Sequence, residues 1–436
     1  MTNNNSPIPA SNSSNKSSSA PSLKSLIPFG AFLGIFLGTG IVLTLQGADF
    51  AFYQLPASIA IIPAILLAIY MGKETVNEQI NQFIAGAGHQ NIITMCIIYL
   101  LAGAFAAVAK ATGSVDASVQ LGLSLFPDYF LLPGLFLVSA FLATAMGTSM
   151  GTIADIDASL IAGCIISGAI FGDNLSIISD TTIASTRSQG AQMKDKFRVN
   201  FKFAVPAALI CLALLAANGV TISHVASQEL DVIGFLPYIV ILALALSGMN
   251  VFMVLIIGIV LAAVIGMLNN DYQLATWVSD INKGFASMQD IFILSLFIGG
   301  LSELIKRQGG LSALTASIER LTLKVSPHNK KRAAGIGIGA LAFCCNFFTA
   351  NNTVSIIVTG ETAKGLAQDG ELSPAHSASM LDIFACINQG LLPYGAQALL
   401  LGATLKISPL DVVANAYYPM ILFFVASFAF WRITRK

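Results

Sequence analysis

Long apolar segments separated by short polar breaks are the feature of this sequence that most constrains its fold. From about Leu26 onward, most of these segments are long enough to cross a lipid bilayer as a helix. Only 10% of the 436 residues are charged, whereas soluble domains usually carry about 25%. The sequence therefore predicts an all-α polytopic membrane protein with about 11–14 membrane segments.

Several segments carry more specific expectations. The run 236–268 is too long for one crossing and is predicted to break near Ser247–Asn250. The segment 74–90 mixes polar and apolar residues, which favours an interfacial helix. Residues 1–25, rich in Ser, Asn and Pro, are predicted to be a disordered tail. The other expected spans after the first lie near 55–72, 92–112, 130–148, 158–172, 203–218, 290–305, 333–348, 353–363, 377–405 and 414–431.

Features of the first half recur in the second half, about 200 residues later. The polar break at Met146–Thr152 recurs at Phe348–Val354, and Pro206 recurs as Pro419. Because such matches keep their order along the chain, they predict a duplicated unit. The predicted organisation is a cytoplasmic tail at 1–25, a first transmembrane repeat at 26–218, an external linker at 219–234 and a second transmembrane repeat at 235–436.

Basic residues are distributed in opposite ways in the two repeats. Loop 187–202 is strongly basic, whereas its counterpart 402–413 holds Lys406 alone. Loop 113–129 has no Lys or Arg, whereas its counterpart 306–332 is strongly basic. Since basic loops stay on the cytoplasmic side, the pattern predicts two inverted-topology repeats with both termini in the cytoplasm. The basic residues of the first loop are Arg187, Lys194, Lys196, Arg198 and Lys202.

Four polar stretches interrupt the apolar runs at matched places in the two repeats. They lie at Met146–Asp157, Phe171–Thr182, Asn346–Thr353 and Asn388–Gly390. Irregular backbone at membrane depth survives only where protein buries it or a cavity hydrates it. The stretches therefore predict discontinuous helices or re-entrant hairpins that meet at a site near the middle of the membrane.

The residue types in these stretches favour a cation site. Hard cations prefer oxygen ligands from carboxylates, hydroxyls, amides and backbone carbonyls. Asp173 and Asp180, the residues expected to hold sodium, are seven apart and share a face if the segment between them is helical. A carboxylate in a low dielectric can exchange a proton for a metal ion, which is one route to antiport. The candidate cation or substrate ligands are Asp173, Asn174, Ser176, Ser179, Asp180, Thr181, Thr182, Gly147, Thr148, Ser149, Thr152, Asp155, Asp157, Asn346, Asn351, Asn352, Thr353 and Asn388.

Structural roles are the alternative for each of these groups. Asp173 and Asp180 could cap a half-helix or pair with Lys202 or Arg198. The aspartates of the first stretch could be N-caps of the helix that follows. The asparagines could bridge helices, and the hydroxyl groups could bond to the preceding turn. The six cysteines lie in apolar stretches and are expected to be small buried residues.

Two of the stretches also resemble a known family. GTSMGT, at Gly147–Thr152, followed by FGDNLSIISDTT, at Phe171–Thr182, resembles the paired signature of the NhaC-type sodium/proton antiporter family. The resemblance implies a secondary transporter of the bacterial inner membrane, with paired hairpins, a scaffold, a mobile transport domain and a homodimeric assembly. The family includes sodium/proton exchangers and sodium-linked malate–lactate exchangers, and relatives move amino acids.

This chain departs from the family pattern at two positions. Ile177 stands where family members often have proline, and Asn174 stands where they often have a basic or titratable residue. An amide does not carry a proton, but its oxygen can still bind a cation.

The sequence therefore predicts a secondary active transporter and not an enzyme. Sodium/proton antiport is the preferred function, with sodium and protons as coupling ions and no bound cofactor. The alternative is sodium-coupled transport or exchange of a small carboxylate or amino acid. A receptor, an intramembrane enzyme and a channel are other membrane classes, but no zinc motif or serine–histidine pair in the spans supports catalysis. No basic tract interleaved with aromatic residues predicts nucleic-acid binding.

Overall fold

The computed structural model describes residues 21–48, 51–115, 117, 132–134, 136–137, 157–176, 179–217, 232–247, 249–269, 272–326 and 329–433. Every regular element in these residues is a helix, so the predicted all-α fold is confirmed. The helices of the first half are a 3₁₀ turn at Leu23–Leu26, α1 (Ile27–Leu45), α2 (Ala51–Gln54), α3 (Ala57–Ala60), α4 (Ile62–Met71), α5 (Val76–Ala87), α6 (Gln90–Ala111), α9 (Ala158–Leu175), α10 (Asp180–Gln189) and α11 (Met193–Ala217).

The second half begins with α12, which starts at Val232 and so takes in the end of the predicted linker at 219–234. The predicted break near Ser247–Asn250 is present between α12 and α13. The helices of this half are α12 (Val232–Leu246), α13 (Val251–Asn269), α14 (Leu274–Ser287), α15 (Gln289–Arg307), α16 (Gly310–Val325), α17 (Lys330–Thr349), α18 (Asn352–Asp369), α19 (Pro374–Leu391), α20 (Ala396–Leu405), α21 (Pro409–Ala414) and α22 (Tyr417–Ile433).

The described part of the chain contains six helices that are long and apolar enough to cross a membrane. The bent pair α14–α15, with an angle of 42° at its break, would make a seventh span. Shorter apolar helices lie at Ala57–Met71 and Tyr417–Ile433. The prediction of about 11–14 segments also counted shorter and interrupted helices, so the two numbers count different things.

The predicted interfacial segment forms α5. The Thr75 hydroxyl accepts a hydrogen bond from the backbone N–H of Glu78, and the Glu78 carboxylate accepts one from the backbone N–H of Thr75. This reciprocal capping box explains why the helix begins at this point. Val76, Ile80 and Ile84 are exposed at a spacing of four residues, so one face of α5 is apolar.

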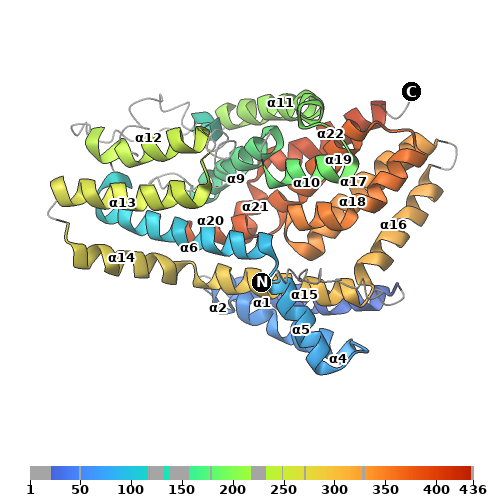
Figure 1. Cartoon of the computed structure of the whole chain (residues 1–436), viewed down its shortest axis with the longest axis horizontal. Helices are drawn as coiled ribbons and strands as arrows, with labels where there is room; N and C mark the ends of the chain where they lie inside the picture. The colour runs from blue at the N-terminus through green and yellow to red at the C-terminus, as the bar shows by residue number, and fades with distance from the viewer. Residues whose placement is uncertain are drawn as a thin grey trace, which may run out of the picture.

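Figure 1 shows α6, α13 and α14 as nearly parallel helices on the left of the view, with α9, α10 and α17–α19 toward the centre and right. The largest apolar core lies among α9, α11, α17, α19 and α22. A second core joins α1 and α4 to α15 and to the region where α17 ends. The buried ion pair described below joins α11 and α19, two helices of the first core.

Two helix pairs pack in a reciprocal manner. α5 of the first half packs against α15 of the second half, and α6 of the first half packs against α14 of the second half. A glycine contact brings each pair close together, because a Cβ atom at Gly86 would collide with the Gly299 carbonyl and one at Gly103 would collide with the Gly284 carbonyl. Small residues allow such close helix crossings. This reciprocity supports the predicted duplication.

A second correspondence involves the helix breaks. α9 and α19 each have 18 residues, and α10 and α20 each have 10. Both α19 and α20 start 216 positions after their counterparts, at Pro374 against Ala158 and at Ala396 against Asp180. Each half therefore contains a long helix, a four-residue break and a short helix in the same register.

Candidate functional site

The stretch Phe171–Thr182 forms a broken helix. α9 ends at Leu175, and α10 begins at Asp180 with Ser179 as its N-cap, whose hydroxyl accepts a hydrogen bond from the backbone N–H of Thr182 at 3.3 Å. The Thr182 hydroxyl donates to the backbone carbonyl of Ser176 at 2.8 Å. A helix that stops inside the protein leaves carbonyl groups without helical partners, and this bond pairs one of them.

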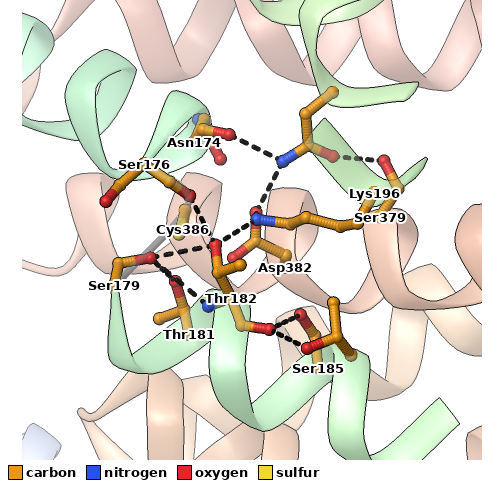
Figure 2. A network of polar contacts seen from close by, with 12 residues as sticks. Asn174, Ser176, Ser179, Thr181, Thr182, Ser185, Lys196, Ser379, Asp382 and Cys386 are labelled. Atoms are coloured by element: carbon orange, nitrogen blue, oxygen red, sulfur yellow. Dashed lines mark hydrogen bonds and ion pairs between the residues drawn. The ribbon is translucent and has the colours of Figure 1, made fainter. Parts of the chain in front are cut away.

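A fully buried ion pair lies beside this break (Figure 2). The Lys196 ammonium is 2.7 Å from Asp382 Oδ2, and the two side chains are only 1% and 0% exposed. The same ammonium donates to the Thr182 hydroxyl at 2.6 Å. Removing two charges from water costs several kcal/mol per ion unless the pair and its hydrogen bonds compensate. The arrangement therefore concentrates charge inside the largest apolar core.

Asn200 joins three helices at the same place. Its side-chain amide donates to the backbone carbonyl of Asn174 and to Asp382 Oδ2, both at 2.8 Å. Its side-chain oxygen accepts a hydrogen bond from the Ser379 hydroxyl. Lys196 and Asn200 are four apart on α11, and Ser379 and Asp382 are three apart on α19, so each pair lies on one helix face. The helical spacing thus brings α9, α11 and α19 together around one carboxylate.

Four buried side-chain oxygens accept no hydrogen bond from any described residue, and three of them belong to α9 and α19. These three are Oδ1 of Asn174, Oδ1 of Asp382 and Oδ1 of Asn388. Asn174 is otherwise held in place, because its amide donates to the Tyr418 hydroxyl at 3.3 Å. Buried oxygens without a donor are costly and uncommon in native proteins. These oxygen atoms are therefore available to bind a cation or to accept a hydrogen bond.

Asp173 is half-buried in the last turn of α9, directly before Asn174. Asn174 is linked to Asp382 through Asn200, which donates to the backbone carbonyl of Asn174 and to Asp382 Oδ2. Asp173 is therefore the sequence neighbour of a residue in this polar cluster.

The second-half stretch Asn346–Thr353 divides between two helices. The Asn346 amide donates to the backbone carbonyl of Ala385 at 2.9 Å, so this asparagine connects α17 to α19. Asn351 is the N-cap of α18. Asn352 reaches the Cys386 thiol at 3.7 Å, and Thr353 is buried in the first turn of α18. Asn352 therefore contacts Cys386, which lies one turn after Asp382 on α19.

Two predictions about helix breaks are corrected by the structure. Asn388–Gly390 lies inside α19, and the chain breaks afterwards, at 392–395, where Pro393 follows Leu392. The condition for Asp173 and Asp180 to share a helix face is not met, because the helix is interrupted between them. Asp180 is the first residue of α10, so its backbone belongs to the following helix.

Other candidates have structural positions or lie outside the described residues. Asp157 is exposed and caps α9, since its carboxylate accepts a hydrogen bond from the backbone N–H of Ser159 at 3.0 Å. Thr181 is buried in α10 beside Ser179, with 3.1 Å between the two hydroxyl oxygens. Gly147, Thr148, Ser149, Thr152 and Asp155 lie outside the residues that the structure describes.

The basic loop 187–202 is largely helical, and this changes the role of its lysine. Lys196 lies in the first turn of α11, where it is buried instead of exposed in a cytoplasmic loop. Arg198, an alternative partner for Asp173 or Asp180, lies 3.6 Å from Asp195. The burial of Lys196 could not be predicted from the sequence. It is one of five basic residues in loop 187–202, and no local signal distinguishes it from the others.

Asp382 was also missed as a candidate ligand. It is a lone carboxylate within the apolar run 377–405. An ionisable residue in such a run is by itself a signal of function. The missed partner Asn200 carries no comparable signal, because its contacts become apparent only when α9, α11 and α19 are packed together.

Comparisons with known proteins agree with the membrane fold. Residues 220–431 match the model of the Na+/H+ antiporter family. The Na(+)/H(+) antiporter NhaC of Alkalihalophilus pseudofirmus is 24% identical to this chain, over 74% of this chain and 78% of the relative. The malate-2H(+)/Na(+)-lactate antiporter of Bacillus subtilis is 25% identical over 88% of each chain. The arginine/ornithine antiporter ArcD of Halobacterium salinarum is 24% identical over 95% of this chain and 93% of the relative. The resemblance seen in the first-half motifs thus agrees with a family match over the second half and with relatives aligned over most of the chain.

Proposed function

We propose that this chain, a relative of the NhaC-type sodium/proton antiporters, exchanges sodium ions for protons across a membrane. The matched family is one of antiporters, and the relatives described above are all named as antiporters. That relationship supports a transport function without enzymatic chemistry. The coupling ions in this proposal are sodium and the proton.

The observation that carries the proposal is a pair of buried, unbonded oxygens in the polar cluster around the Lys196–Asp382 pair. Oδ1 of Asp382 and Oδ1 of Asn174 are buried and accept no hydrogen bond from the described residues. Asn200 bridges the two residues, so both oxygens belong to one cluster. Carboxylate and amide oxygens are ligands of the kind that hard cations prefer. We therefore place the transported sodium ion at Asp382 and Asn174.

Antiport requires that the two ions exclude each other at the carrier. A carboxylate provides such exclusion, because a proton and a sodium ion compete for the same oxygen atoms. Asp382 is the group to which we assign this competition. The break at 176–179 lies beside it, and transporters commonly place their ion sites at discontinuous helices. A change in the packing of α10 against α11 would then expose the site to one side at a time.

Lys196 favours a second candidate function. It supplies the buried cationic group that a substrate carboxylate would need, and the sequence alone indicated no such group at membrane depth. Exchange of a small carboxylate or an amino acid is therefore the alternative. The names of the malate–lactate and arginine/ornithine relatives agree with it.

We also propose a location and assembly. The distribution of basic residues supports a multi-pass protein of the bacterial inner membrane with both termini in the cytoplasm. The family resemblance favours a homodimer in the lipid bilayer.

The test uses the full chain reconstituted in lipid vesicles. A sodium gradient is imposed and the internal pH is followed, first without organic solutes and then with a panel of amino acids and dicarboxylic acids. Sodium alone is expected to move protons. If the pH changes only when an organic solute is present, sodium/proton exchange is wrong and the alternative function is supported.

A further inference from the structure

We propose that Lys196 is a built-in competitor of the transported cation for Asp382. This inference depends on the proposed cation site. In the described structure, the ammonium group occupies one oxygen of the carboxylate at 2.7 Å, while the second oxygen accepts no hydrogen bond from a described residue. A sodium ion at that second oxygen would repel the ammonium held by the other oxygen of the same carboxylate, and would so favour its displacement.

The position of Lys196 makes this displacement feasible. It lies in the first turn of α11, where the partial positive charge of the helix N-terminus disfavours a cation. The Thr182 hydroxyl, 2.6 Å from the ammonium, remains a hydrogen-bond partner when the lysine leaves the carboxylate. Lys196 therefore binds Asp382 strongly enough to neutralise it and can still be displaced.

Displacement of the ammonium would also be transmitted to the helix break. The Thr182 hydroxyl accepts from the Lys196 ammonium and donates to the backbone carbonyl of Ser176, the C-cap of α9. A shift of the ammonium thus changes the hydrogen bonding of the hydroxyl that connects α10 to α9. The competition consequently links occupancy of the cation site to Ser176, at the end of α9.

Competition predicts opposite effects on affinity and on rate. A carrier whose binding-competent state is only fractionally populated binds its ligand more weakly by that fraction. Removing the competitor should therefore tighten cation binding. It should also slow release, because no internal cation is left to replace sodium on the carboxylate.

The test compares Lys196→Gln with Lys202→Gln in the purified full-length protein. Lys202 is exposed on the same helix and provides a matched loss of charge. Sodium binding is measured by isothermal titration with sodium chloride, and transport is measured in vesicles. Lys196→Gln should bind sodium about tenfold more tightly, with a lower KM and a lower kcat, whereas Lys202→Gln should match the unmodified protein.

Several results would overturn the inference. Unchanged or weaker sodium binding by Lys196→Gln, with normal binding by the unmodified protein, rejects the competitor role alone. Unchanged sodium binding with loss of the response to amino or dicarboxylic acids makes Lys196 an anion-binding residue instead. Absence of sodium binding in both proteins rejects the proposed cation site together with this inference.

A second variant decides the matter if Lys196→Gln does not fold. Lys196→Arg keeps the charge and offers a planar group that can bind a carboxylate through two hydrogen bonds. It should compete more strongly and weaken sodium binding several-fold. Binding that is equal to or tighter than that of the unmodified protein would reject the competitor role.

Discussion

The two helix breaks of this protein have the same lengths and spacing but opposite chemistry. The break at 176–179 lies beside the Lys196–Asp382 pair. The break at 392–395 contains Tyr394, whose ring packs edge-on against Phe29, Phe32 and Phe347. The Tyr394 hydroxyl donates to the backbone carbonyl of Phe347 at 2.6 Å.

This difference shows that a repeated backbone can serve two purposes. At the first break, polar groups and charges surround the interrupted helix, which suits binding and release of an ion. At the second break, aromatic rings fill the space and tie the chain to α1 and α17. We therefore expect changes at the first break to affect transport and changes at the second to affect stability.

The largest expected effect is at the first break. Asp382→Asn removes the charge that we assign to sodium and proton binding while nearly preserving side-chain volume. Sodium-dependent proton flux in vesicles should fall about 100-fold or more, because an amide neither neutralises the cation nor carries the proton. Asp195→Asn, which changes a half-exposed carboxylate on α11, is the control and should retain normal flux. Persistent flux in Asp382→Asn would show that another group carries the ions.

Substitutions at the second break should change the stability of the protein. Tyr394→Ala removes a buried aromatic ring and should destabilise the protein by about 3–5 kcal/mol, seen as a lower thermal unfolding midpoint. Tyr394→Phe loses only the bond to the Phe347 carbonyl and should cost about 1 kcal/mol. The sodium concentration for half-maximal flux should stay the same in both. A large change in that concentration would mean that the second break also contributes to the site.

Two substitutions near the first break should have smaller effects and should distinguish a residue that binds the ion from one that only positions it. Asn174→Ala removes an unbonded buried oxygen and should raise the half-maximal sodium concentration about tenfold, the equivalent of about 1.4 kcal/mol. Tyr418→Phe removes only the hydroxyl that accepts from the Asn174 amide, so its effect should be about two- to threefold. Equal effects of the two substitutions would indicate that Asn174 acts by packing and not as a ligand.

The smallest effects concern the starts of α9 and α19, which have equivalent caps, Asp157 and Ser373. Asp157→Ala and Ser373→Ala should each lower stability by about 1 kcal/mol without changing sodium affinity.

The two caps should differ in their pH dependence. Hydrogen bonds from the Ser159 side chain and backbone hold the pKa of Asp157 below its ordinary value of 3.8. The stabilisation by Asp157 is therefore complete above that value and is lost as the pH falls through the lowered pKa. The effect of Ser373→Ala should not change over this range. Thermal unfolding of both variants between about pH 7 and pH 3 tests the difference; a parallel response would reject the assigned caps.

Local sequence signals predicted much of the helical architecture. The excess of apolar residues predicted the membrane fold, and the polar residues at 247–250 predicted the interruption between α12 and α13. The position of the first-half break also followed from Phe171–Thr182. The second-half break was placed too early, at Asn388–Gly390, because polarity was used as its marker. Buried amides can remain helical when neighbouring helices bond them, as Gln389 shows by accepting from Asn346.

The sequence by itself determined that this chain is a helical membrane protein with paired interruptions, because apolar length, helix caps and chain breaks depend on neighbouring residues. The tertiary structure alone decided which charges meet. Asn200 and Asp382 are 182 positions apart, and their contact exists only because α11 and α19 pack side by side. Burial then turns a lysine from a basic run and an aspartate from an apolar run into a strongly interacting pair, since charges interact more strongly where water is excluded.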